Sequence, residues 1–147
     1  MRCAVCGMWE FLINFILRAN KFLTNNRCVM GDFQKLNVWI ISKSLAVSIY
    51  KLTNEDKFKK DFGLTSQLQR AAVSIPSNIA EGDESGSTRL SIRHFYIAKG
   101  SAAELMTQLI IAFEIGYIDR ELKEDLVDQC DKISSMLTNL IKARSRF

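Results

Sequence analysis

The stretch "AAVSIPSNIAEGDESGS" (Ala71–Ser87) decides how this sequence folds. It contains the only proline of the chain, Pro76, within an apolar pattern of helical spacing, and it ends in a run rich in Gly and Ser. Pro76 has no N–H group and its ring opposes the carbonyl four residues earlier, so we expect a kinked helix here. We expect Gly82 and Gly86 to end this helix and allow the chain to reverse. The stretch therefore predicts a corner between two antiparallel helices.

The same run does not fit a phosphate-binding loop. A P-loop needs G-x-x-x-x-G-K-[ST] after a strand, and a dinucleotide fingerprint needs G-x-G-x-x-G within a βαβ unit. The run from Gly82 to Gly86 has no lysine and follows a predicted helix. It also contains Asp83 and Glu84, whose charges would repel a phosphate. We interpret it as a turn.

Apolar periodicity predicts four helices between Phe33 and the end of the chain. Their expected ranges are 33–52, about 65–82 with Thr65 as N-cap, 88–115 with Ser87 or Thr88 as N-cap, and 119–143. The charged residues 54–61 between the first two helices are expected to form a solvated connection, and Gly116 to follow the third helix as its C′ residue. With such short connections, the pattern predicts an all-α, antiparallel up-down-up-down four-helix bundle.

The residue patterns of three of these helices also predict how the helices pack. The first is apolar on more than one side, which in a small bundle requires partner chains and so predicts an oligomer. The third carries small residues, and we expect Gly100 to offset its helix cost of about 1 kcal/mol through close packing. The fourth carries an apolar seam at alternating spacings of four and three, as in bundles. The seam consists of Leu122, Leu126, Cys130, Ile133, Leu137 and Leu140.

The first thirty residues differ in character from the rest. The apolar run 8–17 is interrupted by Glu10 and Asn14 and is too short to span a bilayer, which takes about 20 apolar residues. A signal peptide and an amphipathic surface helix are alternatives. We favour the interpretation that translation starts at Met30 and that the residues before it are an upstream extension of the reading frame. The expected domain organisation is then an N-terminal extension, residues 1–30, and a bundle domain, residues 31–147.

Charge and cysteine content narrow the function. Residues 1–30 carry four Lys and Arg against one Glu, whereas the rest carries sixteen against fifteen Asp and Glu, so the domain is nearly neutral. Cys3 and Cys6 form a C-x-x-C pair, but a zinc site needs a second pair, and Cys28 and Cys130 stand alone. We therefore expect a reduced, cytoplasmic protein without a metal or other cofactor.

No pattern predicts an enzyme. His94 is the only histidine, and its neighbours Arg93 and Phe95 supply neither a nucleophile nor a metal ligand. The E-x-x-H pattern of carboxylate-bridged metal bundles is absent from the sequence. We interpret His94 as a surface or interface residue.

Basic residues remain as candidates for binding nucleic acid. Arg89 and Arg93 stand four apart, on one face of the third predicted helix, while Arg70 lies on the polar side of the second. Lys35 and Lys43 flank the first helix. A solvated surface is the alternative for each of the five, but in a ring of subunits each would be repeated into a belt that contacts phosphates.

The chain also resembles a known family at three stretches. These are "FQKLNVWIISKSLAVSIYKLT" (33–53), "FGLTSQLQRAAVSIPSNIAEG" (62–82) and "FYIAKGSAAELMTQLIIAFEIGYI" (95–118). They resemble the bacterial four-helix-bundle family of the 23S rRNA intervening-sequence proteins, which also includes the accessory protein of diversity-generating retroelements. The positions that match its motif are Leu68, Arg70, Pro76, Asn78, Glu81, Gly82, Gly100, Ser101, Glu104 and Gln108.

The resemblance implies a non-enzymatic four-helix bundle that assembles as a homopentameric ring. For one branch it implies association with RNA, and for the other binding to a reverse transcriptase and nucleic acid. Many members carry a basic G-R-[RK] after the motif, where this chain has an acidic run from Asp83 to Thr88, which weakens a phosphate-binding role there. We expect Arg70 and Glu104 to pair or to line the subunit interface. Two hypotheses follow: a ring that binds RNA or other nucleic acid, and a protein-interaction scaffold or adaptor.

Overall fold

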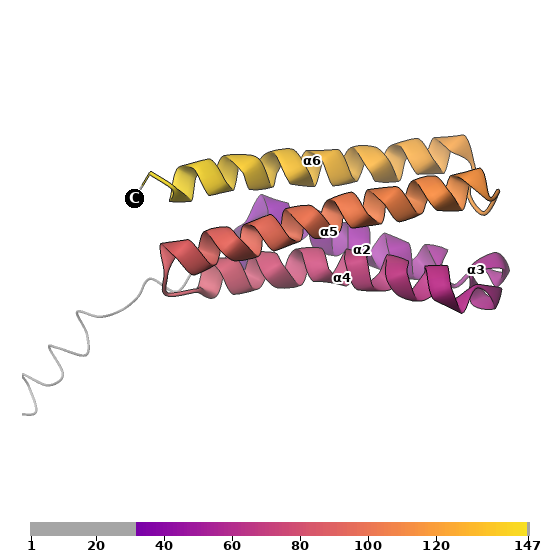
Figure 1. Ribbon diagram of the computed structural model, residues 1–147, viewed down its shortest axis with the longest axis horizontal. Coiled ribbons are helices and arrows are strands. Elements are labelled where there is room, and N and C mark those ends of the chain that lie inside the picture. Colours follow the sequence, from indigo (N-terminus) through magenta and orange to yellow (C-terminus); the bar gives the residue numbers. More distant parts are fainter. Residues whose placement is uncertain (1–31, 147) are drawn as a thin grey trace, which may run out of the picture. The chain divides into compact units, whose positions relative to one another are not determined.

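The computed structural model describes residues 32–146, and in this range four long helices form an antiparallel bundle (Figure 1). The elements are η1 (Phe33–Lys35), α2 (Asn37–Leu52), α3 (Asp56–Lys60), α4 (Phe62–Glu84), α5 (Thr88–Glu114) and α6 (Arg120–Arg144). Each long helix packs against the next along the chain, and α6 returns to α2, so the bundle closes. The prediction of an all-α, up-down-up-down bundle is confirmed. The predicted N-terminal extension, residues 1–30, lies outside the described residues.

The core contains apolar side chains from all four long helices. On α6 the seam is buried at Leu126, Cys130, Ile133 and Leu137. Its last buried residue is Ile141 rather than the predicted Leu140, because the final step of the seam is four residues and not three. Among residues 32–146, no helix is both long enough and apolar enough to cross a membrane.

The buried Cys130 thiol is expected to be unreactive. Burial, and secondarily the charge of Asp131, raises its pKa to about 12, so the thiol stays protonated at neutral pH. A protonated, buried thiol is a poor nucleophile. Cys130 therefore packs as a small apolar side chain, as the seam predicted.

The helix α4 begins earlier than predicted. Its N-cap is Asp61, whose side chain accepts a hydrogen bond from the backbone N–H of Leu64. The predicted cap, Thr65, lies one turn inside the helix and donates its hydroxyl to the carbonyl of Phe58 at 2.7 Å. The prediction of Thr65 as N-cap was wrong. Asp and Thr are both good capping residues, but the Thr65 hydroxyl is bound to the carbonyl of Phe58, and Asp61 caps the helix instead.

The segment between α2 and α4 is also more structured than predicted. It contains the short helix α3, and its one aromatic residue, Phe58, is fully buried. The Phe58 ring packs edge-on against Tyr117 with 5.3 Å between ring centroids. The adjacent Lys57 donates its ammonium to the carbonyl of Gly116 at 3.0 Å. The connection is therefore fastened to the turn between α5 and α6.

Gly116 shapes that turn as predicted. Its φ of 76° is the left-handed conformation that glycine adopts without steric cost. The N–H of Gly116 donates to Phe113 and that of Tyr117 to Ala112, which is the hydrogen-bond pattern of a Schellman motif. Asp119 then caps α6 by accepting from the N–H of Leu122.

At the opposite end, Gly82 does not end α4, contrary to the prediction. The helix runs unbroken across Pro76 and on to Glu84, and the reversal uses residues 85–87. Gly82 is buried, and a Cβ atom built there would lie 2.6 Å from Cε1 of Phe95 and 3.1 Å from the carbonyl oxygen of Ser91. The glycine is therefore required for close approach of α4 and α5 rather than for a turn.

The small residues of α5 divide into two groups. Ala98, Ser101 and Ala102 are buried, as close packing requires. Gly100 is exposed, and a Cβ built there would meet no atom within 4 Å. The expectation that Gly100 serves packing is therefore not met within this chain.

We predict that Gly82→Ala destabilises the bundle, by about 1–3 kcal/mol, because the added methyl group overpacks the contact with Phe95. Gly63→Ala is the matched control, since a Cβ there meets only the Asp61 side chain, at an ordinary 3.5 Å. We expect this control to be neutral or stabilising by about 0.5–1 kcal/mol. Urea unfolding followed by circular dichroism measures both. An equal response of the two variants would contradict a special role for Gly82.

Candidate functional site

The structure separates the five candidate basic residues. Lys35 lies at the start of the described chain and forms an exposed ion pair with Asp32 at 2.7 Å. The hydrogen bond and charge of Asp32 raise the pKa of Lys35. Lys43 lies two turns along, with its ammonium 5.1 Å from the centroid of the Trp39 ring. Both lysines therefore already have partners, although both remain exposed.

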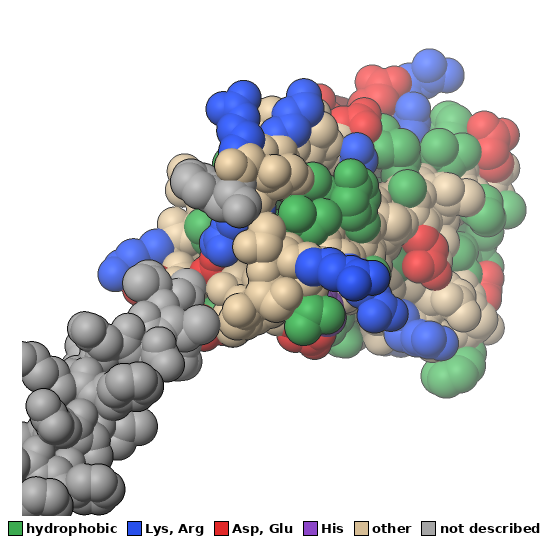
Figure 2. All heavy atoms as spheres, turned by 60° about the vertical axis from the view of Figure 1, so that its left-hand side comes forward, with side chains coloured by type: hydrophobic (Ala, Val, Ile, Leu, Met, Phe, Trp, Pro, Cys, Tyr) green, Lys and Arg blue, Asp and Glu red, His purple; other side chains and the backbone are tan. Residues whose placement is uncertain are grey.

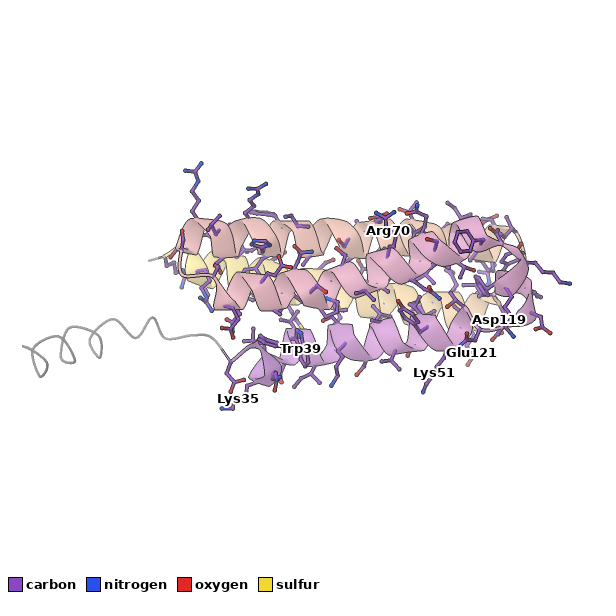
Figure 3. The ribbon with its side chains drawn as sticks, turned by 90° about the horizontal axis from the view of Figure 1, so that it is seen from below. Lys35, Trp39, Lys51, Arg70, Asp119 and Glu121 are labelled. Atoms are coloured by element: carbon purple, nitrogen blue, oxygen red, sulfur yellow. The ribbon has the colours of Figure 1, made fainter. Side chains whose placement is uncertain are left out.

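Arg70 lies apart from the other four. Figure 3 shows it on the opposite side of the bundle from Lys35. It lines an open pocket of about 440 Å³ between α2, α4 and α5, which also includes Tyr50 and Glu104. None of the ion pairs among residues 32–146 joins Arg70 to Glu104, whose carboxylate instead accepts a hydrogen bond from Gln108 at 3.3 Å. Arg70 and Glu104 therefore do not pair within one chain, and the alternative, that they line the subunit interface, stays a prediction.

Arg89 and Arg93 occupy the first two turns of α5. Their spacing of four residues places them on one face of the helix, and both are exposed. Neither takes part in the ion pairs found among the described residues. These two guanidinium groups are therefore available to an anion.

The antiparallel topology gathers more positive charge around them. We call the basic half the part of the bundle nearest the α4–α5 turn, residues 32–44, 73–100 and 132–146, and the remainder the acidic half. The basic half carries nine Lys and Arg against four Asp and Glu, and the acidic half seven against eleven. In Figure 2, Lys and Arg side chains are most frequent toward the near end, and carboxylates toward the far end.

Sequence reasoning missed the contribution of α6 to this surface. The basic residues at its end are Lys142, Arg144 and Arg146. Basic residues in the last turn of a helix favour its dipole, and that local role gives no sign of a shared surface. In an antiparallel bundle the end of α6 lies beside the start of α5, so the predicted topology was enough to predict that these residues lie near Arg89 and Arg93.

The acidic run after Gly82 is less repulsive than its sequence suggests. Asp83 is buried in the last turn of α4, with its carboxylate 2.6 Å from the guanidinium of Arg144. This ion pair neutralises Asp83 and joins the ends of α4 and α6. The expectation of an acidic loop is corrected, because Asp83 and Glu84 both belong to the helix.

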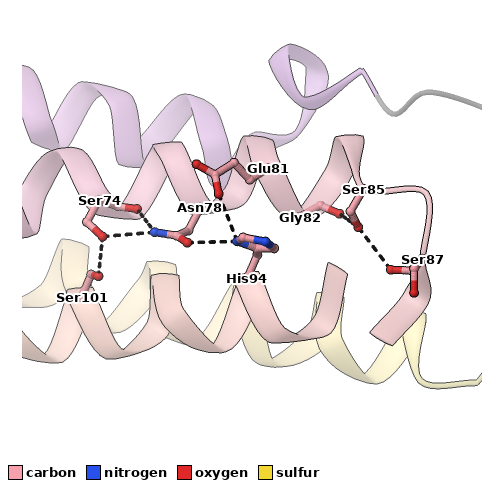
Figure 4. A network of polar contacts seen from close by, with 8 residues as sticks. All are labelled: Ser74, Asn78, Glu81, Gly82, Ser85, Ser87, His94 and Ser101. Atoms are coloured by element: carbon pink, nitrogen blue, oxygen red, sulfur yellow. Dashed lines mark hydrogen bonds and ion pairs between the residues drawn. The ribbon is translucent and has the colours of Figure 1, made fainter. Parts of the chain in front are cut away.

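His94 belongs to a polar network between α4 and α5 (Figure 4). Its Nδ1 lies 3.2 Å from both the Asn78 side-chain oxygen and the Glu81 carboxylate, so this nitrogen donates. The Asn78 amide in turn donates to the carbonyl and hydroxyl of Ser74, and that hydroxyl contacts Ser101 at 2.8 Å. The network holds the two helices in register next to the contact between Gly82 and Phe95.

This network contains no arrangement typical of catalysis. The Ser74 hydroxyl contacts Ser101 and Asn78 but forms no hydrogen bond with His94, so histidine does not activate it. Over residues 32–146, no group of three His, Cys, Asp or Glu side chains could hold a metal ion.

We predict that Arg144→Ala destabilises the bundle by about 2–4 kcal/mol, because it leaves the buried Asp83 carboxylate without its partner. Arg146→Ala removes the same charge two residues later, where the side chain is exposed, and should change stability by less than about 0.5 kcal/mol. The measurement is the free energy of unfolding in urea. If both variants were equally stable, the Asp83–Arg144 pair would have no structural importance.

Comparisons with known proteins match this fold. A family model described as "23S rRNA-intervening sequence protein" matches residues 34–139. A solved structure from Bacteroides thetaiotaomicron, described as a protein of unknown function from the S23 ribosomal protein family, is 30% identical with a TM-score of 0.66. The match covers 71% of this chain and 98% of that one. No curated protein matches the chain.

Proposed function

The chain belongs to the 23S rRNA-intervening sequence protein family, and we propose that it is a non-enzymatic, homo-oligomeric protein that binds RNA through its basic half. The observation that carries this proposal is the separation of charge along the bundle. The whole described domain is nearly neutral, but its basic half has an excess of five positive charges. Such a surface attracts phosphates and steers a polyanion to one end of the molecule.

The pairing of the carboxylates strengthens this surface. Two of the four acidic residues in the basic half are paired with a cation, since Asp32 contacts Lys35 and Asp83 contacts Arg144, and a third, Glu81, accepts a hydrogen bond from His94. The unpaired arginines Arg89 and Arg93 are therefore not neutralised by the carboxylates around them. Arginine also suits this role because its planar fork of donors matches the oxygens of a phosphate.

Assembly into a ring would multiply these charges. On α2, Ile40, Val47 and Tyr50 are 42%, 49% and 46% exposed, and their spacings of seven and three place them on one face. On α5, Ile110 and Ile111 are similarly exposed in the acidic half. These surfaces support a contact between copies that runs along α2 and the acidic half of α5. Such a contact would leave the first turns of α5 uncovered, so that each copy adds its arginines to a shared belt.

We predict that Arg89→Glu with Arg93→Glu weakens RNA binding by at least about tenfold, and lowers by about two the slope of log K against log salt. The measurement is fluorescence anisotropy with a labelled 23S rRNA stem-loop, between about 50 and 200 mM salt.

Lys59→Glu with Lys60→Glu is the matched control, because it makes the same change of net charge in the acidic half. We expect less than about a twofold effect from it. Equal losses in the two double variants would mean that net charge alone governs binding. Absence of binding at low salt would refute the RNA proposal and favour the second hypothesis, an adaptor that docks a protein such as a reverse transcriptase.

We predict that Ile40→Ser with Val47→Ser reduces the molar mass measured by multi-angle light scattering toward that of a monomer. The helical content should not change, because neither side chain belongs to the buried core. Phe62→Ser, which removes an 83% exposed apolar side chain outside α2, is the control and should keep the mass of the unsubstituted protein. An unchanged mass in the α2 variant would place the contact between copies elsewhere.

A further inference from the structure

An exposed aromatic side chain lies within the positive surface of the basic half. Tyr96 is 59% exposed. It follows Arg93 by three residues and Arg89 by seven on α5, so the three side chains share one face of the helix. With a rise of about 1.5 Å per residue, they span about 10 Å along the helix axis.

A second helix adds positive charge beside the same tyrosine. The ammonium of Lys99, on α5, donates to the hydroxyl of Thr138 on α6 at 2.9 Å, which fixes the register of the two helices. Because α5 and α6 are antiparallel, Lys142, one turn beyond Thr138, lies opposite the turn of α5 that precedes Lys99. That turn contains Tyr96, so the register brings Lys142 of α6 to the level of Tyr96.

The ring of Tyr96 is also open to an incoming ligand. Gly100 lies one turn further along the same face, and a Cβ built there would have no neighbour within 4 Å. Ala103, the next residue on that face, is likewise small and exposed. The Tyr96 hydroxyl takes part in none of the side-chain hydrogen bonds among residues 32–146. The side chain thus has no evident structural role in the monomer.

We propose that Tyr96 is a stacking platform for an unpaired base, and that Arg89, Arg93 and Lys142 hold the phosphates on either side of it. This inference rests on the proposed RNA binding and names its substrate class: single-stranded nucleic acid. Aromatic rings stack on bases of any sequence, and stacking combined with cationic contacts to the backbone is the usual physics of single-strand binding. In a duplex the bases are already stacked, so a duplex gains only the phosphate contacts.

The cationic surroundings favour this ligand over a protein partner. An exposed tyrosine at a protein interface is typically the centre of an apolar patch from which charged residues are depleted. Tyr96 instead shares one face of α5 with the exposed cations Arg89 and Arg93, whose mutual repulsion is relieved by a polyanion. The exposed apolar residues Leu90 and Ile97 lie further around the same helix. A contact with a protein or with a second copy is an outcome that the experiment below separates.

The test measures the affinity of the full-length protein for three fluorescein-labelled probes of equal length: a uridine oligomer, a fully abasic oligomer and an RNA duplex. We expect Tyr96→Ala to weaken binding of the uridine oligomer by about fivefold to a hundredfold, the usual effect of losing one stacked base. Binding of the abasic oligomer and of the duplex should change by less than about twofold. Tyr96→Phe and Tyr96→Trp keep an aromatic face and should retain the affinity.

Each other result identifies what has failed. Equal losses on all three probes, or a loss in Tyr96→Phe as large as in Tyr96→Ala, would overturn stacking. A changed molar mass of Tyr96→Ala in light scattering would overturn it too, and would assign Tyr96 to a contact between copies. Salt-sensitive binding that Tyr96→Ala leaves unaltered would refute this inference alone, whereas no binding of any probe by the unsubstituted protein would refute the proposed function with it.

Discussion

The close contact between α4 and α5 at Gly82 is the constraint on which the basic end of the bundle depends. A side chain at this position would collide with the Phe95 ring, so only glycine allows the helices to approach as they do. The same approach brings Asn78 and Glu81 within hydrogen-bonding distance of His94. Because α4 continues past Gly82, Asp83 also lies close enough to pair with Arg144 at the end of α6. The absence of a side chain at Gly82 thereby helps to position the end of α4, the start of α5 and the end of α6.

The antiparallel order of the helices then separates positive and negative charge along the bundle, although the domain as a whole is nearly neutral. Acidic residues are frequent where α6 begins and basic residues where it ends, as the helix dipole favours. Because α5 starts where α6 ends, the arginines of the first turns of α5 add to the positive end. Total charge is therefore a poor guide to the ligands of this domain, since the two halves nearly cancel in the sum.

Much of this could be predicted from the sequence, and the errors have physical reasons. The middle of the α6 seam, from Leu126 to Leu137, follows from periodicity, and the left-handed Gly116 follows from glycine's conformational freedom; both were confirmed. The end of the seam was wrong, because Ile141 is buried there and Leu140 is not. Gly82 was misinterpreted as a helix stop because local sequence cannot show that Phe95, thirteen residues later, returns to the same place. Phe58 was missed because one aromatic residue among charges gives no periodicity, although tertiary packing buries it completely. Of the site, Arg89 and Arg93 were recognisable as a pair, whereas Lys142 required the pairing of α5 with α6.

Charge and shape contribute differently to what such a surface can recognise. Positive charge alone gives affinity for any polyanion and falls with salt, so it cannot by itself distinguish a duplex from a single strand. An aromatic side chain among the cations supplies that distinction, because only an unpaired base offers a free face for stacking. The guanidinium of Arg144 is already engaged by the buried Asp83, whereas Arg89 and Arg93 take part in none of the ion pairs among the described residues. The residues proposed to face a ligand, Arg89, Arg93 and Tyr96, can therefore change without loss of the ion pair between Asp83 and Arg144 that joins the helix ends.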